Sequence, residues 1–554
     1  MALQEPQVAA WKLANQQDYQ LACPQHYQYY GQELGVRDIS EDCLYLNVFT
    51  PYARPMAREK FAVMVYIHGG FWDHGSANTF PPHMLVASQQ VVVVTFNFRL
   101  GPLGFLATGD GAAPGNYGLL DQRMAIQWVY DNIEAFNGDR ERITLFGPGS
   151  GAASAGLHML SPSSARMVRR VIAQSGSAVA DWAVATRPSI VNSSAAALAR
   201  QVGCHDIRDS WRMVECLRRV PFTDMIGLTM RPEAGWTMWS PVVDRHTRDQ
   251  NFLPYSPQEL LQSSSTVFRP DIAYMAGVTR NEGSAFLKEE IKEPNHEVTP
   301  EILHRRIWDY IRMYNFTLDR AALIKAIEFM YWPASDRKNH TLLRQAYIDL
   351  LSDSYINAPN DKMAKLLMQR SVRTYLYVLN YTLEGLPQRD TWEGVPHNHE
   401  YFMVTGAPFM DHSIYPPYMN LANARWTESD RNMSQLLMTL WANFAKHGDP
   451  TPVLLNDHVL WRESSLESMR FLMLNNTNYT TRMVDGGFRQ KESQFWSEYL
   501  PSSVLSTDSP PIWGQPEWQQ DRQRYQVALS CVAGLAALCF VLMVLCCCLY
   551  CRSR

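Results

Sequence analysis

The sequence predicts an α/β protein in which one large, mixed and mostly parallel sheet is covered by helices. Short apolar runs at residues 61–70 and 91–100 are rich in β-branched side chains, as is typical of strands buried on both faces. The segment 119–136 carries apolar residues at helical spacing, and strand-like runs follow at 143–146 and 169–176. This alternation of strands and helices favours a parallel sheet with helices packed on its faces.

The composition is that of a globular protein with a large core. Of the 554 residues, 46% are hydrophobic and 19% are charged, which excludes a wholly disordered or collagen-like chain. The formal net charge is only −4, whereas a nucleic-acid binder needs a basic surface to neutralise phosphates. We therefore expect no nucleic-acid partner.

The C-terminal part of the sequence contains a predicted transmembrane helix. Residues 527–549 carry no charged side chain, and at about 1.5 Å per residue they can span a hydrocarbon core of ~30 Å. A buried soluble helix is the alternative, which we disfavour because so little sequence follows that could pack over it. We place the span at 525–550, a Pro/Ser-rich stalk at 501–524 and a short cytoplasmic tail at 551–554.

The ten cysteines divide into two groups. Six lie in or beside the predicted span, and those at its end form a candidate S-palmitoylation site, with simple apolar packing as the alternative. These are Cys546, Cys547, Cys548 and Cys551. The other four form an even set in the large domain, the number expected if all are paired. They are Cys23, Cys43, Cys204 and Cys216.

Asn-x-Ser/Thr sequons are in excess, since seven occur where the composition predicts roughly three. They are Asn192, Asn315, Asn339, Asn380, Asn432, Asn475 and Asn478. Asn432 lies in a predicted amphipathic helix, and Asn475 and Asn478 crowd each other, so we expect four or five to be glycosylated. Together with the span, the excess predicts a single-pass plasma-membrane glycoprotein with its N-terminus outside. The N-terminus carries no signal peptide, which suggests a truncated or alternative start.

The candidate catalytic turn follows the predicted strand at 143–146. Many hydrolases place their nucleophile in a sharp Gly-x-Ser-x-Gly turn between a strand and a helix. The flanking glycines are here Gly147 and Gly151, so the nucleophile position is occupied by Gly149, which has no side chain to attack a carbonyl. Ser150 stands one position too late, and we expect its side chain to point away from the substrate cleft.

Ten motifs occur in order along the chain and together resemble those of the type B carboxylesterase and cholinesterase family over about residues 1–500. They are SEDCLYLNVFTP (40–51), VYIHGG (65–70), NFRLGPLGF (97–105), PGNYGLLDQ (114–122), AFNGDRERITLFG (135–147), QSGSA (174–178), PVVD (241–244), GVTRNEG (277–283), WANFAKHGDP (441–450) and FRQKESQFW (488–496). The resemblance implies an α/β-hydrolase fold whose first strands are missing from this chain. It also implies the disulfides Cys23–Cys43 and Cys204–Cys216. We expect neither a cofactor nor a metal site.

The resemblance assigns the positions of a Ser-Glu-His triad. Glu282 in GVTRNEG stands at the acid position, His397 in WEGVPHNHE stands at the base position, and Gly149 stands where the serine should be. The family's oxyanion loop normally contains three glycines whose N–H groups face the developing charge. Here the loop reads Gly69-Gly70-Phe71, so a bulky residue replaces the third glycine. We expect both parts of the machinery to be vestigial.

These changes resemble those of the neuroligins, a branch of catalytically inactive, membrane-tethered adhesion proteins. We therefore expect a non-catalytic cell-surface protein that binds an extracellular, neurexin-like protein partner at a synapse. The tail at 551–554 is shorter than in neuroligins and has no PDZ-binding end. The alternative function is a membrane-anchored carboxylic ester hydrolase with an atypical nucleophile elbow.

The resemblance also implies a homodimer, because family members often pair through a four-helix bundle. The matching segments are 341–370 and 491–500, in which apolar residues recur at helical spacing. These residues are Leu343, Ala346, Tyr347, Leu350, Leu351, Phe495 and Tyr499. The alternative is that these faces pack on the core of their own subunit.

Overall fold

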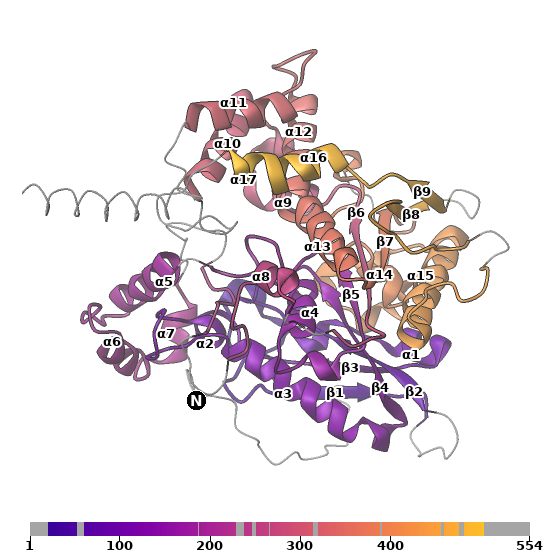
Figure 1. The fold of residues 1–554 in the computed structure, drawn as a ribbon, viewed down its shortest axis with the longest axis horizontal. Coiled ribbons are helices and arrows are strands. Elements are labelled where there is room, and N and C mark those ends of the chain that lie inside the picture. The colour runs from indigo at the N-terminus through magenta and orange to yellow at the C-terminus, as the bar shows by residue number, and fades with distance from the viewer. Residues whose placement is uncertain are drawn as a thin grey trace, which may run out of the picture.

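Nine strands form one mixed sheet in the computed structural model, among the residues that it describes (Figure 1). The described residues are 20–503 apart from 53–59, 187, 229–237, 246–250, 265, 267, 314–319, 388–389, 456–458 and 476–480. The strands are β1 Leu46–Phe49, β2 Phe61–Tyr66, β3 Val92–Phe96, β4 Gly138–Pro148, β5 Arg170–Gln174, β6 Ala273–Thr279, β7 Arg373–Asn380, β8 Arg470–Asn475 and β9 Arg482–Asp485.

The sheet is parallel in its centre and antiparallel at both edges. Its order is β1-β3-β2-β4-β5-β6-β7-β8-β9, with β1 antiparallel to β3 and β9 antiparallel to β8. All the pairings between these edges are parallel. The mostly parallel sheet that the sequence predicts is thus confirmed.

The core lies on both faces of this sheet, as the continuous apolar runs predict. Along β2, Val63 and Val65 pack into one cluster, whereas Met64 and Tyr66 pack into the other. The first cluster includes residues of α3 (Tyr117–Asn132) and α4 (Ser150–Leu160), and the second includes residues of α1 (His83–Gln89), α14 (Tyr401–Val404) and α15 (Glu428–His447). Because successive strand residues alternate between faces, a strand buried on both faces must be apolar throughout.

The helices surround the sheet, and α10, α11 and α12 gather with α16 and α17 at one end of the molecule (Figure 1). They are α1 His83–Gln89, α2 Gly101–Phe105, α3 Tyr117–Asn132, α4 Ser150–Leu160, α5 Pro188–Gln201, α6 Ser210–Leu217, α7 Phe222–Ile226, α8 Pro257–Gln262, α9 Gly283–Glu290, α10 Pro300–Met313, α11 Arg320–Tyr331, α12 His340–Ser352, α13 Ala358–Gln369, α14 Tyr401–Val404, α15 Glu428–His447, α16 Gln490–Gln494 and α17 Leu500–Ser502. Two π-helical turns, Asp353–Asn357 and Phe495–Tyr499, join α12 to α13 and α16 to α17.

The element boundaries differ from the sequence prediction at several ends. The strand predicted at 143–146 extends over Gly138–Pro148, and the strand predicted at 91–100 covers only Val92–Phe96. The apolar run continues beyond β3 because Phe98 and Leu100 remain buried after the strand has ended. After Phe96 the apolar residues therefore indicate buried side chains and do not show where the strand ends.

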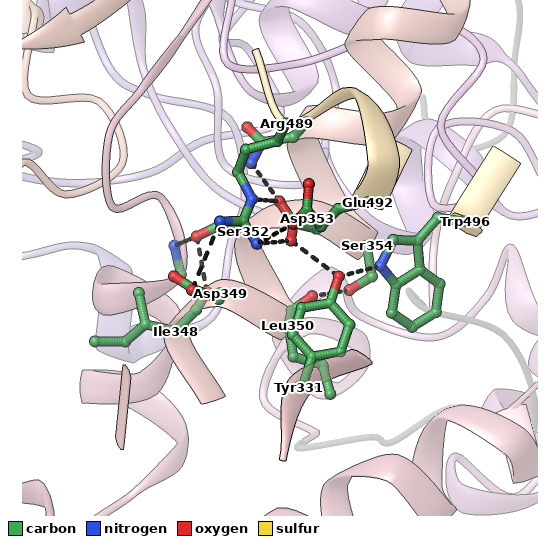
Figure 2. Close-up of polar contacts among 12 residues, drawn as sticks. Tyr331, Ile348, Asp349, Leu350, Ser352, Asp353, Ser354, Arg489, Glu492 and Trp496 are labelled. Atoms are coloured by element: carbon green, nitrogen blue, oxygen red, sulfur yellow. Dashed lines mark hydrogen bonds and ion pairs between the residues drawn. The ribbon is translucent and has the colours of Figure 1, made fainter. Parts of the chain in front are cut away.

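The C-terminal helices are held by a buried polar network, drawn in Figure 2. The Nε of Arg489 donates to a carboxylate oxygen of the buried Asp353 at 2.5 Å. Tyr331 donates its hydroxyl to the other oxygen at 2.9 Å and accepts from the indole N–H of Trp496 at 2.6 Å. Burial raises the pKa of Asp353 to about 6 despite Arg489. The network therefore fastens α16 to α11 and to the π-helical turn after α12.

The residues predicted to form a dimer interface lie mostly inside the protomer. Six of the seven are buried, namely Leu343, Ala346, Tyr347, Leu350, Leu351 and Phe495. The apolar spacing on α12 thus reflects packing on the subunit's own core, which was the alternative, and α12 packs against α9. Of the predicted residues only Tyr499 is exposed, with 57% of its surface accessible. The prediction that these seven residues together form the dimer interface is therefore wrong.

Most of the predicted membrane-proximal features lie outside the described residues. These features are the span at 525–550, the tail at 551–554, the cysteines of the candidate palmitoylation site and the stalk beyond residue 503. Within the part of the chain that is described, no helix is long and apolar enough to cross a membrane.

Candidate active site

The turn between β4 and α4 has the backbone of a nucleophile elbow without a nucleophile. Gly149 connects the two elements with φ 55° and ψ −116°. A Cβ on Gly147 or on Gly151 would lie within 2.1 Å of the carbonyl oxygen of Ile67, so both flanking positions require glycine. The sequence thus folds into the tight strand-to-helix turn of a hydrolase, and only the side chain at position 149 is absent.

Glu282 and His397 form the acid–base pair that the sequence predicts. Glu282 lies directly before α9 and is fully buried. One of its carboxylate oxygens accepts from the backbone N–H of Thr279 at 2.6 Å, and the other is 2.6 Å from Nδ1 of His397. Burial alone lowers the pKa of His397, but the charge and hydrogen bond of Glu282 outweigh it, so the pKa is raised.

The free nitrogen of His397 faces Gly149. A Cβ placed on Gly149 would lie 3.2 Å from Nε2 of the imidazole. Nε2 has no hydrogen-bond partner among the described residues, and 19% of the His397 side chain is exposed. The structure therefore brings all three triad positions together, with Nε2 of His397 next to the position from which a serine side chain would extend.

Ser150 does not replace the missing nucleophile in this arrangement. It is the first residue of α4 and is buried, and its Oγ has no hydrogen-bond partner in the described part of the chain. A nucleophilic hydroxyl needs a base within hydrogen-bond reach, and the structure records no hydrogen bond between Ser150 and His397.

The oxyanion loop carries backbone strain at its bulky residue. Gly70 has φ 103°, and Phe71 and Trp72 follow with φ 49° and 61°, a region that residues with side chains rarely adopt. The ring of Phe71 lies 5.8 Å from that of Trp182 and 6.3 Å from that of Phe286, measured between centroids. The altered loop therefore packs its large side chain into an aromatic cluster.

Two neighbours of His397 were not found by sequence reasoning. The ring of Phe286 on α9 lies 5.3 Å from the imidazole, and Glu400 is a second fully buried carboxyl group. Burial and the charge of Glu282 raise the pKa of Glu400 to about 7. Both residues are close in sequence to a triad position. Phe286 comes four residues after Glu282, and Glu400 comes three residues after His397. That proximity was the one available signal, because burial of a carboxyl group cannot be read from its residue type.

The structure contains both implied disulfides, Cys23–Cys43 and Cys204–Cys216, with Cα atoms 4.9 and 5.9 Å apart. They close loops that are far in sequence from the triad positions. No group of three or more His, Cys, Asp or Glu residues within the described ranges is arranged to hold a metal ion.

The sequons have different settings in the fold. Asn339 is an exposed N-cap of α12. Asn432 is exposed and lies on α15, so the helix that the sequence predicts around it is present. Asn380, at the end of β7, donates its side-chain amide to Asn475 at the end of β8, with 2.9 Å between the atoms. Asn192 lies on α5. Asn315 and Asn478 lie outside the described residues.

Comparison with known proteins gives a family match and several relatives. The model of the carboxylesterase family matches residues 3–496. Human neuroligin-2 is 32% identical over 499 residues, which cover 84% of this chain and 57% of neuroligin-2. Mouse neuroligin-3 is 33% identical over 500 residues, covering 84% of this chain and 58% of that protein. Acetylcholinesterase of Bungarus fasciatus is 31% identical over 488 residues, which cover 85% of this chain and 74% of that protein. The chain thus spans less than two thirds of the neuroligins that it matches.

Proposed function

We propose, from the premise that this chain belongs to the carboxylesterase family, that it is a non-catalytic cell-surface adhesion protein of the neuroligin kind. Family membership supplies the hydrolase scaffold, and the similarity to neuroligins covers 84% of the chain.

One observation carries the proposal, which is the glycine in the elbow. Gly149 keeps the strained backbone of the turn, and Nε2 of His397 faces it, so the triad lacks only its reacting atom. Loss of a triad member leaves a residual catalysis of about 10³–10⁴ over water in proteases with an intact oxyanion hole. Here Phe71 also alters that hole, so we expect less.

The proposed topology places residues 1–500 outside the cell. A stalk at 501–524 would connect them to a span at 525–550, and the tail at 551–554 would lie in the cytoplasm. Three observations support this topology, namely the two disulfides, the exposed sequon at Asn339, and the uncharged run in the sequence.

The proposed partner is an extracellular protein of the neurexin type, bound by the ectodomain. We also propose a homodimer, as the resemblance to the family implies. Most apolar residues of α12 are buried, and the exposed large apolar side chains on α12 and on the C-terminal helices are Leu342 and Tyr499, with 38% and 57% of their surfaces accessible. A dimer through these helices would therefore rely on Leu342, Tyr499 and the exposed polar residues Lys491, Gln494 and Glu498.

Adhesion is tested with full-length protein displayed on cells. We expect these cells to aggregate with cells that display a candidate neurexin-like partner, and not with cells that lack it. The matched variant Tyr499→Ser changes the proposed dimer face alone. Comparing it with the wild type shows whether aggregation requires the dimer or only the partner. Absence of binding across a panel of surface proteins would contradict the proposal.

The second candidate function is ester hydrolysis, and the intact Glu282–His397 pair favours it. The two residues remain at hydrogen-bond distance, as a working base requires. A fluorophosphonate probe labels an activated serine, so we expect no labelling of this protein. Labelling that disappears in Ser150→Ala would establish Ser150 as a nucleophile and overturn the non-catalytic proposal.

A further inference from the structure

Two arginines lie on either side of the first residue of β6, at the end of the sheet opposite the turn between β4 and α4. Arg170 begins β5 and Arg373 begins β7, and both pair in register with Ala273, which begins β6. Neighbouring strands are about 4.8 Å apart, so the Cα atoms of the two arginines are roughly 10 Å apart. Residues paired in register project from the same face of a sheet. Between the two long side chains, Ala273 contributes only a methyl group.

Both arginine side chains reach Gly448, which ends α15. A Cβ placed on this glycine would lie 3.0 Å from Nη2 of Arg373 and 3.1 Å from Nε of Arg170. It would lie 3.7 Å from the Cβ of Ala273. Gly448 has φ 69°, the left-handed conformation in which helices often end and which glycine adopts without strain. Two guanidinium groups therefore converge on the side-chain position of a glycine.

One donor of Arg170 has no acceptor although the residue is buried, with 7% of its surface exposed. Its Nη1 donates to the carbonyl oxygen of Ala445 at 2.6 Å, and its Nη2 donates to that of Lys446 at 3.4 Å. These bonds cap the C-terminal end of α15, but Nε has no hydrogen-bond partner within the described ranges. A buried N–H without an acceptor costs free energy. The capping role of Arg170 therefore accounts for two of its nitrogens and leaves the third unexplained.

Two further cations beside Gly448 have donors to spare. Arg373 is exposed, and its guanidinium group takes part in no hydrogen bond or ion pair in the described part of the chain. Lys446, in the last turn of α15, is half-buried, and its ammonium group likewise has no such partner there. The nearest acidic residue in the sequence is Asp449, one oxygen of which accepts from the backbone N–H of Thr451 at 2.8 Å. The cluster therefore has a surplus of positive charge.

The charges of the cluster act on one another. Burial, together with the charges of neighbouring arginines that include Arg142 and Arg373, lowers the pKa of Arg170 to about 10, although Asp139 opposes them. Arg170 is therefore still charged at pH 7. Burial and the charge of Arg142 likewise lower the pKa of Lys446. Like charges that are held close together destabilise one another, and a bound dianion would offset that repulsion.

We propose that this cluster binds a doubly charged tetrahedral oxyanion, a sulfate or phosphate group, with Arg373 and Lys446 as its exposed donors and the buried charge of Arg170 behind them. The fork of a guanidinium group matches two oxygens of such an ion, and the ammonium group can bind a third. No bond is made or broken. The site lies at the other end of the sheet from Gly149 and does not depend on the adhesion proposed above.

The test is calorimetric titration of the full-length protein with sodium sulfate at pH 7, with sodium chloride keeping the ionic strength constant. Calorimetry is preferred to melting, because sulfate stabilises folded proteins in general. Sodium acetate is the matched ligand, with one charge and a planar carboxylate. We expect saturable binding of sulfate and of inorganic phosphate, no binding of acetate, and weaker binding of sulfate at higher total salt.

Glucose 6-sulfate distinguishes the two sources of the oxyanion. A dissociation constant below that of inorganic sulfate indicates a group carried on a larger ligand, and one that is equal or higher indicates the free ion.

Variants of the two exposed donors test the cation cluster. Arg373→Ala and Lys446→Ala should each raise the dissociation constant of sulfate about tenfold, through loss of a charge-assisted hydrogen bond. Neither side chain is buried, so we expect both variants to fold. Arg219→Ala is the control, because this exposed arginine is paired with Glu215, and it should bind sulfate as the wild type does.

A pair of glycine variants locates the ion. Gly448→Ala places a methyl group 3.0 Å from Nη2 of Arg373 and should weaken binding. Gly203→Ala is its control, because Gly203 also has a left-handed φ of 82° but has nothing within 4 Å of its Cβ position. If Gly448→Ala does not fold, Arg373→Ala and Lys446→Ala decide. Absence of saturable sulfate binding, equal binding of acetate, or an unchanged dissociation constant in both cation variants would overturn the proposal.

Discussion

Nε2 of His397 lies 3.2 Å from the point where a side chain on Gly149 would begin. Nε2 of the triad base is thus still directed at the nucleophile position. The carboxylate of Glu282 lies 2.6 Å from the other ring nitrogen, Nδ1. Loss of the serine has therefore left the pair in place. The structure separates two defects that sequence reasoning treats together, a missing side chain in the elbow and a bulky one in the oxyanion loop.

Replacing Gly149 with Ser should not by itself produce a fast esterase. The hydroxyl would stand within reach of His397, but Phe71 occupies the third glycine position of the oxyanion loop with φ 49°. Loss of one oxyanion donor costs about 10²–10³ in kcat. We expect the double variant Gly149→Ser/Phe71→Gly to exceed Gly149→Ser by about that factor in hydrolysis of p-nitrophenyl acetate.

Equal turnover of the single and double variants would show that Phe71 is tolerated. A third variant, Gly149→Ser/His397→Gln, serves as the control, since a serine without its base should return to background hydrolysis.

The Glu282–His397 pair should stabilise the fold most at low pH. The folded-state pKa of His397 is raised above its ordinary value, so the folded protein binds the proton more tightly than the unfolded chain does. The contribution is fully present below the unfolded pKa of about 6.5 and is lost as the pH rises through the folded pKa. Urea denaturation of the wild type and of His397→Gln should therefore give a difference in unfolding free energy that shrinks between pH 5.5 and pH 9. A difference that grows with pH would contradict this assignment.

The Arg489–Asp353 pair should contribute to stability in a pH-dependent way. Removing one partner of a buried pair costs about 3–5 kcal/mol, but a quarter of the Arg489 side chain is exposed, so for Arg489→Ala we expect a loss of about 2 kcal/mol. Asp353 has a pKa of about 6 because it is buried. In the variant, the unpaired negative charge of Asp353 destabilises the folded state at pH 7.5. Protonation at pH 5 removes that charge, so we expect a smaller loss at pH 5.

Urea denaturation at the two pH values measures this loss. Arg219→Ala is the matched control, because Arg219 and its partner Glu215 are both largely exposed. An exposed pair of this kind contributes less than about 1 kcal/mol. A loss in Arg489→Ala that is as small as in the control, or that does not depend on pH, would show that the network in Figure 2 is not needed for docking α16.

Much of the fold could be predicted from the sequence, because burial on both faces leaves a continuous apolar signature in strands such as β2 and β3. The triad positions could be predicted because each lies in a motif set by tight backbone geometry, as at Gly147 and Gly151. The role of Leu343 could not be predicted, since an apolar helix face is the same whether it meets a second subunit or the protein's own core. The burial of Glu400 could not be predicted either, because its environment is assembled from residues distant in the chain.

The contrast between Leu343 and Tyr499 gives the last prediction. Leu343 is fully buried on α12, so Leu343→Ala should cost about 2–5 kcal/mol of unfolding free energy through the cavity that it leaves. Tyr499 is 57% exposed, so Tyr499→Ser should leave the unfolding free energy of the protomer nearly unchanged. If the C-terminal helices form a dimer interface, Tyr499→Ser should instead raise the dissociation constant in sedimentation experiments. A dimer that is insensitive to Tyr499 would have to use another face. A Leu343→Ala protomer of undiminished stability would mean that α12 does not pack as the structure shows.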